Sequence, residues 1–546
     1  MDDFIFILND KGSAPAEFRL DILGQSFGSS AEDAKVVTVF QTIPVLLTLV
    51  TGWLFPLNPV AAHFWNLLIH LIFAVLIFSW GGRLLRLLDL METPEIRNQA
   101  ALVGALIFAC HPLGTEPVHY AKCHMVQLVA LFGFWATCEA AEYLAFPNRR
   151  AGFRFLIATG LCVLSYFPGT VMLGFNLAAL VLFNRLGKSG DLTARAMLSS
   201  PAMRRPAVLV ASGLAGSAIL YLAYFFLSAY GQVITNWGEI YPTHIVTQGR
   251  VFWEYFQRIF VPVNLASDHF QPWSTFRDPV AVAKLIAFAA LLLISAWFVI
   301  KKGSPRSRSF HLLLLLALIP FAIRMLYVNI EIMVEYRAYN ALPWIALLFG
   351  CGLTKISVLL SSSKLRWLPT AAVVVIFMVL SVERGRVWRS AGQLAENVLT
   401  QYPLNNRSRV QLQLLDLKQA DPLDVLRLHQ EAVEVREQIN EFNIQSKGRV
   451  LIDPIRSNLI LIASYQFAVY ATAEVAGPTK ALAFADESIT TLKKRLPASF
   501  VNIPNQTQVA AWPLLEAREV MARRNLGNVT GKDNSPRTNS ESRSPD

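Results

Sequence analysis

Repeated apolar runs of about 17–25 residues constrain the fold of this chain most, because an α-helix needs that length to cross a bilayer. In a chain of 546 residues with 54% hydrophobic content, such runs predict a polytopic membrane protein. The expected spans lie at roughly 60–80, 99–111, 123–145, 152–167, 169–185, 206–228, 279–300, 309–327, 339–358 and 367–383. The predicted fold class is therefore all-α, a membrane helical bundle of about 10–11 spans followed by a soluble helical domain.

The distribution of basic residues predicts the orientation of this bundle. The net charge of +11 could indicate a nucleic-acid partner, but within the apolar part of the chain most Lys and Arg fall in alternate short loops such as PNRRAGFR and KKGSPRSRS. By the positive-inside rule these loops are cytoplasmic. The loops HPLGTEPVHY, 229–278 and VNIEIMVEYRAY, which are poor in Lys and Arg, then face outward. We therefore expect a bilayer as partner and no nucleic acid.

The two ends of the chain differ from the apolar middle. Residues 384–526 are soluble in character, with paired amphipathic helical patterns that predict a tetratricopeptide-like domain on the outer side. The tail, 527–546, is rich in Ser, Asn and Pro and is predicted to be disordered. In residues 1–59, the apolar segment 36–55 either spans the membrane, with a cytoplasmic N-terminus, or lies on the outer surface.

Four polar clusters fall in the segments predicted to face outward. They are Asp2-Asp3 with Asn9-Asp10; the stretch from His111 to Tyr120 with Lys122 and His124 beyond it; Asp268-His269; and Glu335, Arg337 and Tyr339. Each alone could be a solvated loop or a frayed terminus. Ionisable residues at membrane depth are costly, however, and usually line a cavity or pair with one another. In an extended segment the alternation in EYRAY would place its three polar residues on one face.

The order and spacing of six motifs resemble the GT-C membrane glycosyltransferases, specifically the TMTC-type O-mannosyltransferases and their bacterial relatives with C-terminal tetratricopeptide repeats. The motifs are DDFIFILN, the passage from KVVTVFQTIP to LNPVAAHFWNLLIH, HPLGTEPV, YFQRIFVPVNLASDH, VEYRAYNALP and RGRVWRSAGQL. The likeness covers nearly the whole apolar part of the chain. The family normally has a span before its DD pair, whereas here Met1 directly precedes it. The first span is thus expected to be missing from 1–59.

The resemblance implies a chemistry and assigns roles to residues. An acceptor hydroxyl would attack the anomeric carbon of a sugar carried on a polyprenyl phosphate, with inversion, while a carboxylate takes the proton. Asp3 or Asp2 would be that base, and Arg337 would bind the donor phosphate with help from His124 or Lys122. Supporting roles fall to His111, Glu116, Glu335, Tyr339, Asp268 and His269.

The expected partners are the lipid-linked sugar and a protein or glycan acceptor, at the outer face of a bacterial inner membrane with a periplasmic C-terminal domain. We expect no cofactor, although Asp3, Asp268 and His269 could together hold a divalent metal. The five cysteines include no CxxC pair and imply neither a zinc site nor a disulfide framework. Three other functions stay open: a non-catalytic scaffold, a transporter, and a glycan polymerase or ligase.

Overall fold

The computed structural model describes residues 42–55, 59–120, 123–146, 148–188, 237–301, 304–326, 332–360, 366–418, 421–446, 450–451, 454–495 and 517–524. Several predictions fall outside these ranges: the expected base residues Asp2 and Asp3, the phosphate-binding candidate Lys122, and the span expected at 206–228. Contacts divide the chain into two units. The N-terminal unit comprises Met1–His269 and Ser274–Trp388, and the C-terminal unit comprises Phe270–Trp273 and Arg389–Asp546.

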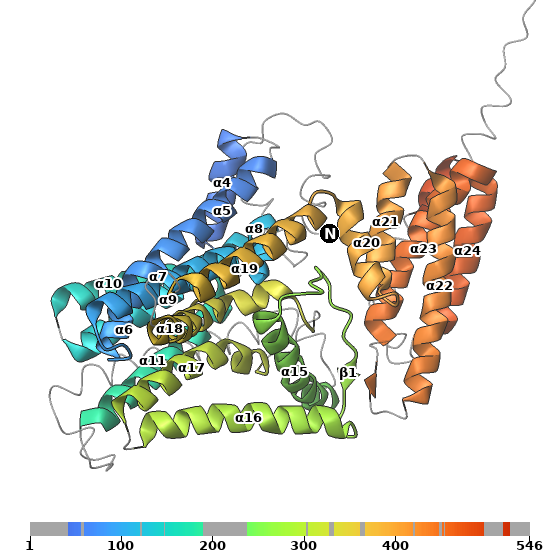
Figure 1. Ribbon diagram of the computed structural model, residues 1–546. Coiled ribbons are helices and arrows are strands. Elements are labelled where there is room, and N and C mark those ends of the chain that lie inside the picture. The colour runs from blue at the N-terminus through green and yellow to red at the C-terminus, as the bar shows by residue number, and fades with distance from the viewer. Residues whose placement is uncertain are drawn as a thin grey trace, which may run out of the picture. The chain divides into compact units, whose positions relative to one another are not determined.

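The described part of the N-terminal unit is helical, which confirms the all-α prediction (Figure 1). Its α-helices are α4 (Thr42–Leu54), α5 (Pro59–Leu76), α6 (Gly82–Leu87), α7 (Pro94–Cys110), α8 (Thr115–His119), α9 (His124–Ala145), α10 (Arg149–Ser165), α11 (Phe167–Lys188), α15 (Trp237–Phe260), α16 (Pro279–Ile300), α17 (Pro305–Arg324), α18 (Leu342–Leu359) and α19 (Leu368–Val387). Three shorter elements are the π-helix η1 (Ile77–Gly81) and the 3₁₀ helices η2 (Pro112–Gly114) and η4 (Glu335–Asn340). A two-residue strand, β1 (Trp273–Ser274), follows α15 in the chain.

Six helices in the described residues are long and apolar enough to cross a membrane. They are His63–Leu87, His124–Ala145, Pro279–Ile300, Pro305–Arg324, Leu342–Leu359 and Leu368–Val387, and the bent pair Pro94–Cys110 with Pro112–His119 would make a seventh. These helices indicate a membrane protein. The expected spans at 152–167 and 169–185 are helical, but neither α10 nor α11 meets the same test of length and composition. Three arginines in the first six residues of α10 lower its apolar character.

Local sequence explains where several of these helices begin. Thr93 precedes Pro94 and accepts a hydrogen bond from the backbone N–H of Ile96, which caps α7. Asp278 precedes Pro279 and accepts from the N–H groups of Val280 and Ala281 at the start of α16. Proline suits the first helical position because its missing N–H would have no partner there.

The core of the N-terminal unit is centred on α5, α7, α9, α17 and α18. Its largest fully buried side chains include Phe73, Phe108, Phe134, Tyr339 and Trp344. The helices α7 and α18 approach most closely where glycines meet. A Cβ atom added to Gly350 would lie 2.2 Å from the carbonyl oxygen of Ala100, and one added to Gly104 would lie 2.9 Å from that of Ala346. Small residues at such crossings let two helices pack backbone to backbone.

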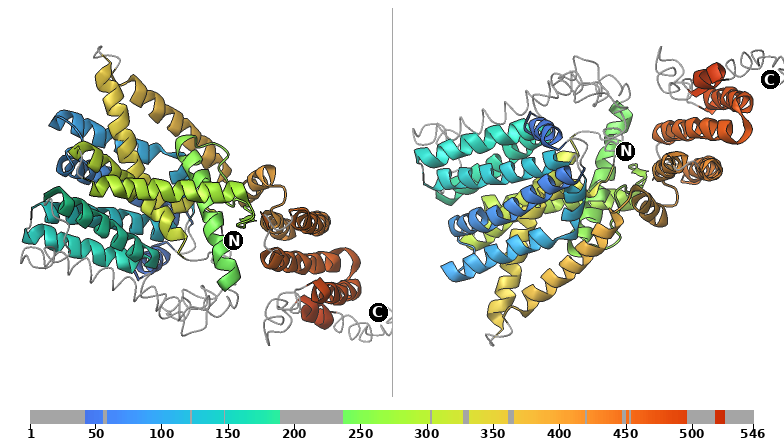
Figure 2. Two further views of the ribbon diagram at one scale, coloured as in Figure 1. Left: turned by 90° about the horizontal axis from the view of Figure 1, so that it is seen from below. Right: turned by 90° about the horizontal axis from the view of Figure 1, so that it is seen from above.

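At the edge of this unit, α15 runs steeply across the direction of α16 (Figures 1 and 2). Only 17% of the residues in the apolar stretch of α16 are buried. Most of the apolar surface of this helix is therefore exposed. Exposed side chains such as Leu293 and Trp297 face away from the protein core. An apolar helix exposed in this way suits contact with hydrocarbon rather than water.

The C-terminal unit consists of successive helices that each pack against the next (Figure 2). These are α20 (Ala391–Gln401), α21 (Asn406–Lys418), α22 (Pro422–Gln445), α23 (Pro454–Ala476) and α24 (Pro478–Arg495), with a two-residue strand β2 (Val450–Leu451) between α22 and α23. Their core is apolar and includes Ala432, Leu461, Val469, Ala485 and Met521. Serial packing of neighbouring helices provides a surface that extends along the unit.

Candidate functional site

The break between α7 and α8 occurs at the HPLGTEPVHY stretch, where the two helices differ in direction by 55°. His111 is extended because the residue before a proline avoids the helical region. Its Nδ1 accepts from the N–H of Leu113 at 3.2 Å, so its Nε2 carries the proton and donates to the carbonyl of Ile259 at 3.0 Å. His111 therefore holds the bend and ties it to α15.

Glu335 is the centre of a buried polar cluster at the start of η4. The residue is 0% exposed, and three donors from two segments distant in sequence, the loop after α15 and the end of α19, contact its carboxylate. The N–H of Ala266 lies 2.6 Å from Oε1, Nε2 of His269 lies 2.9 Å from the same oxygen, and Nη2 of Arg384 lies 3.4 Å from Oε2. A buried carboxylate needs such donors to offset the loss of its water.

These donors also determine the charge of Glu335. Burial alone would raise the pKa of this carboxyl, but the charge of Arg384 and the hydrogen bonds from His269 and Ala266 outweigh burial and hold the pKa below its ordinary value. Glu335 is therefore an anion at neutral pH. It fixes the loop before Asp268-His269 and the end of α19 against η4.

A second buried carboxylate, Glu116 of α8, lies against the next residue of η4. Its Oε2 accepts from the backbone N–H of Tyr336 at 2.7 Å, and the residue is 2% exposed. The orphan N–H groups at the start of a helix favour a carboxylate in this position. The motifs HPLGTEPV, NLASDH and EYRAY therefore meet in space, through Glu116, His269 and Glu335.

Arg337 is also buried in this region, at 7% exposed. Its guanidinium carbon lies 5.9 Å from the centre of the Tyr336 ring. Tyr255 of α15 lies within electrostatic reach: burial raises the pKa of this phenol, while the positive charges of Arg337 and Arg324 act against that rise. The Tyr255 hydroxyl donates to the carbonyl of Val334 at 2.8 Å, which fixes the backbone just before η4.

The prediction that Glu335, Arg337 and Tyr339 share one face is wrong. Residues 335–340 form a 3₁₀ helix with three residues per turn, so side chains two positions apart point in different directions. Glu335 meets His269 and Arg384, and Arg337 lies over Tyr336. The Tyr339 hydroxyl instead lies 2.8 Å from Nδ1 of His70 in the apolar core. Tyr339 is thus a packing residue against α5 and α7.

Two other predicted site residues have less informative positions. His124 begins α9, and its Nε2 lies 3.3 Å from Oγ1 of Thr48 in α4. Asp268 is buried at 8% exposed beside His269.

Within the described ranges, no group of three His, Cys, Asp or Glu side chains is placed to hold a metal ion. The alternative of a metal held by Asp3, Asp268 and His269 depends on a residue outside those ranges.

Arg384 is the residue that the sequence reasoning missed. It is 5% exposed, pairs with Glu335, and lies 5.8 Å from the centre of the Trp388 ring. The Trp388 ring in turn lies 6.1 Å from His119 and 6.5 Å from Tyr120, just after the bend. The available signal was an arginine within the last turn of an apolar span, at the first position of the RGRVWRS lead into the C-terminal helices.

The cluster thus combines two buried carboxylates, two buried arginines and an aromatic wall of Tyr120, Tyr336 and Trp388. Such a set can hold an anion and a planar or ring-shaped group beside it. No family model, curated protein or solved structure matches this chain.

Proposed function

We propose that the chain is an inverting glycosyltransferase of the GT-C kind, which moves a sugar from a polyprenyl-phosphate donor to a hydroxyl group of an envelope protein or glycan. The reaction would take place on the outer face of a bacterial inner membrane. The C-terminal unit would be periplasmic, tetratricopeptide-like in character, and would present the acceptor. The observation that carries the proposal is the convergence of Glu116, His269 and Glu335 from three separate motifs beside the buried Arg337.

In the proposed reaction, the acceptor oxygen forms a bond to the anomeric carbon as the bond from that carbon to the phosphate oxygen breaks. The acceptor proton passes to the carboxylate of Asp3 or Asp2. The bonding electrons leave with the phosphate, and Arg337 stabilises the negative charge that develops there. A guanidinium suits this role because it offers parallel donors to two phosphate oxygens. Lys122 or His124 would assist.

The buried carboxylates have supporting roles in this proposal. Glu335 is fully buried and receives three donors from the protein, so it positions Arg384 and the His269 loop instead of exchanging protons with substrate. Glu116 orients the backbone of Tyr336, the residue before Arg337. A rigid shell of this kind keeps a phosphate-binding arginine within the small error that catalysis tolerates.

Because the Glu335 carboxylate already receives three donors from the protein, a second candidate is also favoured: a non-catalytic membrane scaffold whose external helices bind other proteins. In that case the buried cluster only joins α19 to η4. Charged side chains that are completely paired inside a protein commonly have such structural roles. The two candidates differ in what happens when Arg337 or Asp3 is changed without loss of folding.

Mass spectrometry of envelope proteins and glycans separates the candidates. A deletion strain is complemented with wild type, Asp3→Asn, Arg337→Ala or the control Arg386→Ala, whose side chain is 55% exposed and pairs only with the nearby Glu383 among the described ion pairs. A sugar-sized mass that is lost on deletion and restored by wild type and Arg386→Ala alone supports the transferase. Full restoration by Asp3→Asn and Arg337→Ala, at equal protein levels, supports the scaffold.

A further inference from the structure

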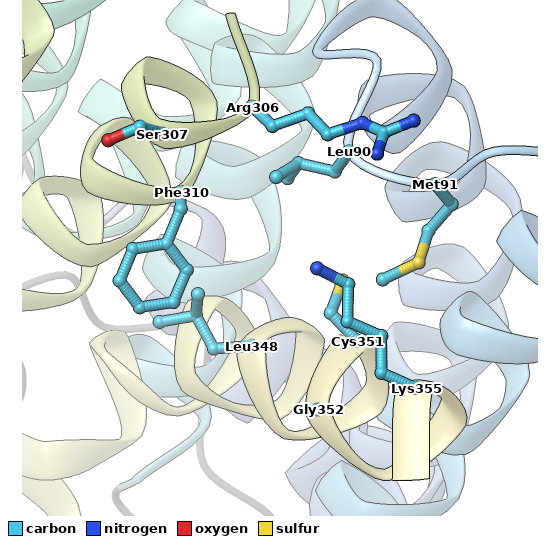
Figure 3. Close-up of a pocket in the computed structure, with 9 residues that line it drawn as sticks. All are labelled: Leu90, Met91, Arg306, Ser307, Phe310, Leu348, Cys351, Gly352 and Lys355. Carbon is cyan, nitrogen blue, oxygen red and sulfur yellow. The ribbon is translucent and has the colours of Figure 1, made fainter. Parts of the chain in front are cut away.

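A pocket whose lining shares no residue with the Glu335 cluster lies between the start of α17 and α18 (Figure 3). It has a volume of about 290 Å³. The lining residues come from the loop after α6 (Leu90, Met91), from α17 (Arg306, Ser307, Phe310) and from α18 (Leu348, Cys351, Gly352, Lys355). The pocket therefore has an apolar floor and a polar rim.

The two cations of the pocket come from different helices. Figure 3 shows the Lys355 amino group pointing into the space between the elements, with the Arg306 side chain along the opposite edge. Arg306 also pairs with Glu92 at 3.1 Å, but both side chains are more than half exposed. An exposed pair of this kind is weak, so an anion in the pocket can share Arg306 with Glu92.

The floor of the pocket continues onto apolar surface. Leu90 and Met91 are buried, and Phe310 at the mouth is 46% exposed. Both α17 and α18 are long and apolar enough to span a membrane. A pocket with a cationic rim and an apolar floor at the ends of two such helices matches the junction of a lipid headgroup with its chains.

We propose that this pocket binds the phosphate and glycerol region of an anionic phospholipid, with the acyl chains lying along α17 and α18. Its volume is near the lower limit for small-molecule sites, about 300 Å³, which suits a headgroup and excludes a whole lipid. The segment KKGSPRSRS, which contains Arg306, belongs to the set that the charge distribution places in the cytoplasm. The ligand would then come from the inner leaflet, which carries most anionic lipid.

Gly352 makes the proposal testable without removing charge. A Cβ atom added there would meet nothing within 4 Å, so the space in front of this glycine is open. Gly352→Leu would fill the pocket while both cations stay in place. Arg306→Gln with Lys355→Gln would leave the pocket open and remove the two charges. Arg150→Gln is the matched control, an exposed arginine at the start of α10 on the same predicted side.

The test uses the full chain in nanodiscs of phosphatidylcholine with a minor share of phosphatidylglycerol, and native mass spectrometry counts the phosphatidylglycerol retained. We expect Gly352→Leu and the double glutamine variant each to weaken retention by about tenfold, and Arg150→Gln to retain as much as wild type. Thermal unfolding of each variant checks that it is folded. Equal retention by all variants, or an equal loss with Arg150→Gln, overturns the proposal in favour of general surface attraction.

A second arm separates a lipid from a free anion. Inorganic phosphate at millimolar concentration is added before the lipid is counted. If the site recognises a lipid, the apolar floor contributes to binding and phosphate does not displace phosphatidylglycerol. Complete displacement overturns the lipid assignment and leaves a simple anion site.

Discussion

Nε2 of His269 lies 2.9 Å from Oε1 of Glu335, which is 66 residues later in the chain, and both side chains are completely buried. This contact joins the loop after α15 to the 3₁₀ turn before α18. Arg384 reaches the other oxygen of the same carboxylate from the end of α19. One anion thus holds three segments, so its removal should affect both stability and the candidate site.

Glu335→Gln should destabilise the protein by about 3 kcal/mol, because it leaves the buried Arg384 without its counter-charge. The effect of the substitution should also become smaller as the pH falls. The pKa of Glu335 is lowered in the folded state, so its stabilisation is present above the ordinary pKa of 4.5 and is lost as pH falls through the folded value. In acid, therefore, wild type and Glu335→Gln should converge.

Unfolding midpoints of the full chain in detergent, followed by tryptophan fluorescence from pH 7 downward, measure this. Glu383→Gln is the control, since Glu383 is 57% exposed and pairs with the exposed Arg386; its cost should stay below about 1 kcal/mol. If Glu335→Gln melts with wild type at pH 7, the carboxylate is not the anchor that its contacts indicate.

Two glycines of α18 should respond in opposite ways to alanine. Gly350→Ala places a Cβ atom 2.2 Å from the Ala100 carbonyl, so α7 and α18 must separate at a cost of about 1–3 kcal/mol. Gly352→Ala meets open space and should be neutral or stabilising by up to about 1 kcal/mol, from the better helix propensity of alanine. Melting temperatures of the two variants provide the comparison. Equal melting temperatures would contradict the close approach of the two helices.

The C-terminal unit should lose stability between pH 6.5 and 4 because of His429. This residue is 8% exposed, with Nδ1 3.0 Å from the Ser464 hydroxyl, and burial lowers its pKa from 6.5 to about 4. The unfolded chain binds a proton below 6.5 and the folded chain only below about 4, so stability is present above 6.5 and falls as pH drops toward 4. The loss should amount to about 3 kcal/mol.

Hydrogen–deuterium exchange of α22 and α23 peptides in the full chain, corrected for the intrinsic effect of pH, measures this loss. His429→Leu should flatten the pH dependence between 6.5 and 4. Ser464→Ala removes the hydrogen bond but keeps the imidazole, so the pH dependence should persist. A steep pH dependence in His429→Leu would assign the loss to other groups.

Sequence patterns predicted the helical segments better than the contacts between them. The span expected at 279–300 coincides with α16, and the one expected at 123–145 differs from α9 by one residue. The span expected at 99–111 ends one residue beyond α7, directly before Pro112, because a proline ends a helix through local sterics alone. Such features depend on neighbours within a few residues.

The details of the site depend on partners far along the chain, which a pattern does not encode. The alternation in EYRAY was interpreted as extended, but Glu116 caps this turn from 220 residues away and Tyr255 fixes the carbonyl of Val334 just before it. Arg384 was missed because its partner Glu335 lies 49 residues earlier. The role of Tyr339 likewise depends on His70, 269 residues away.

Arg337→Lys should reduce sugar transfer by about 10²-fold while leaving the fold intact. Lysine keeps the positive charge but lacks the planar pair of donors that a phosphate accepts, and loss of one preorganised donor costs about 10²–10³-fold in turnover. Arg386→Lys is the control: Arg386 is an exposed arginine in the last turn of α19, and this variant should transfer the sugar as wild type does. Transfer is measured by the appearance of the sugar-sized mass on the acceptor, per molecule of enzyme. Wild-type transfer by Arg337→Lys would remove Arg337 from the reacting phosphate and leave it as a packing residue over Tyr336.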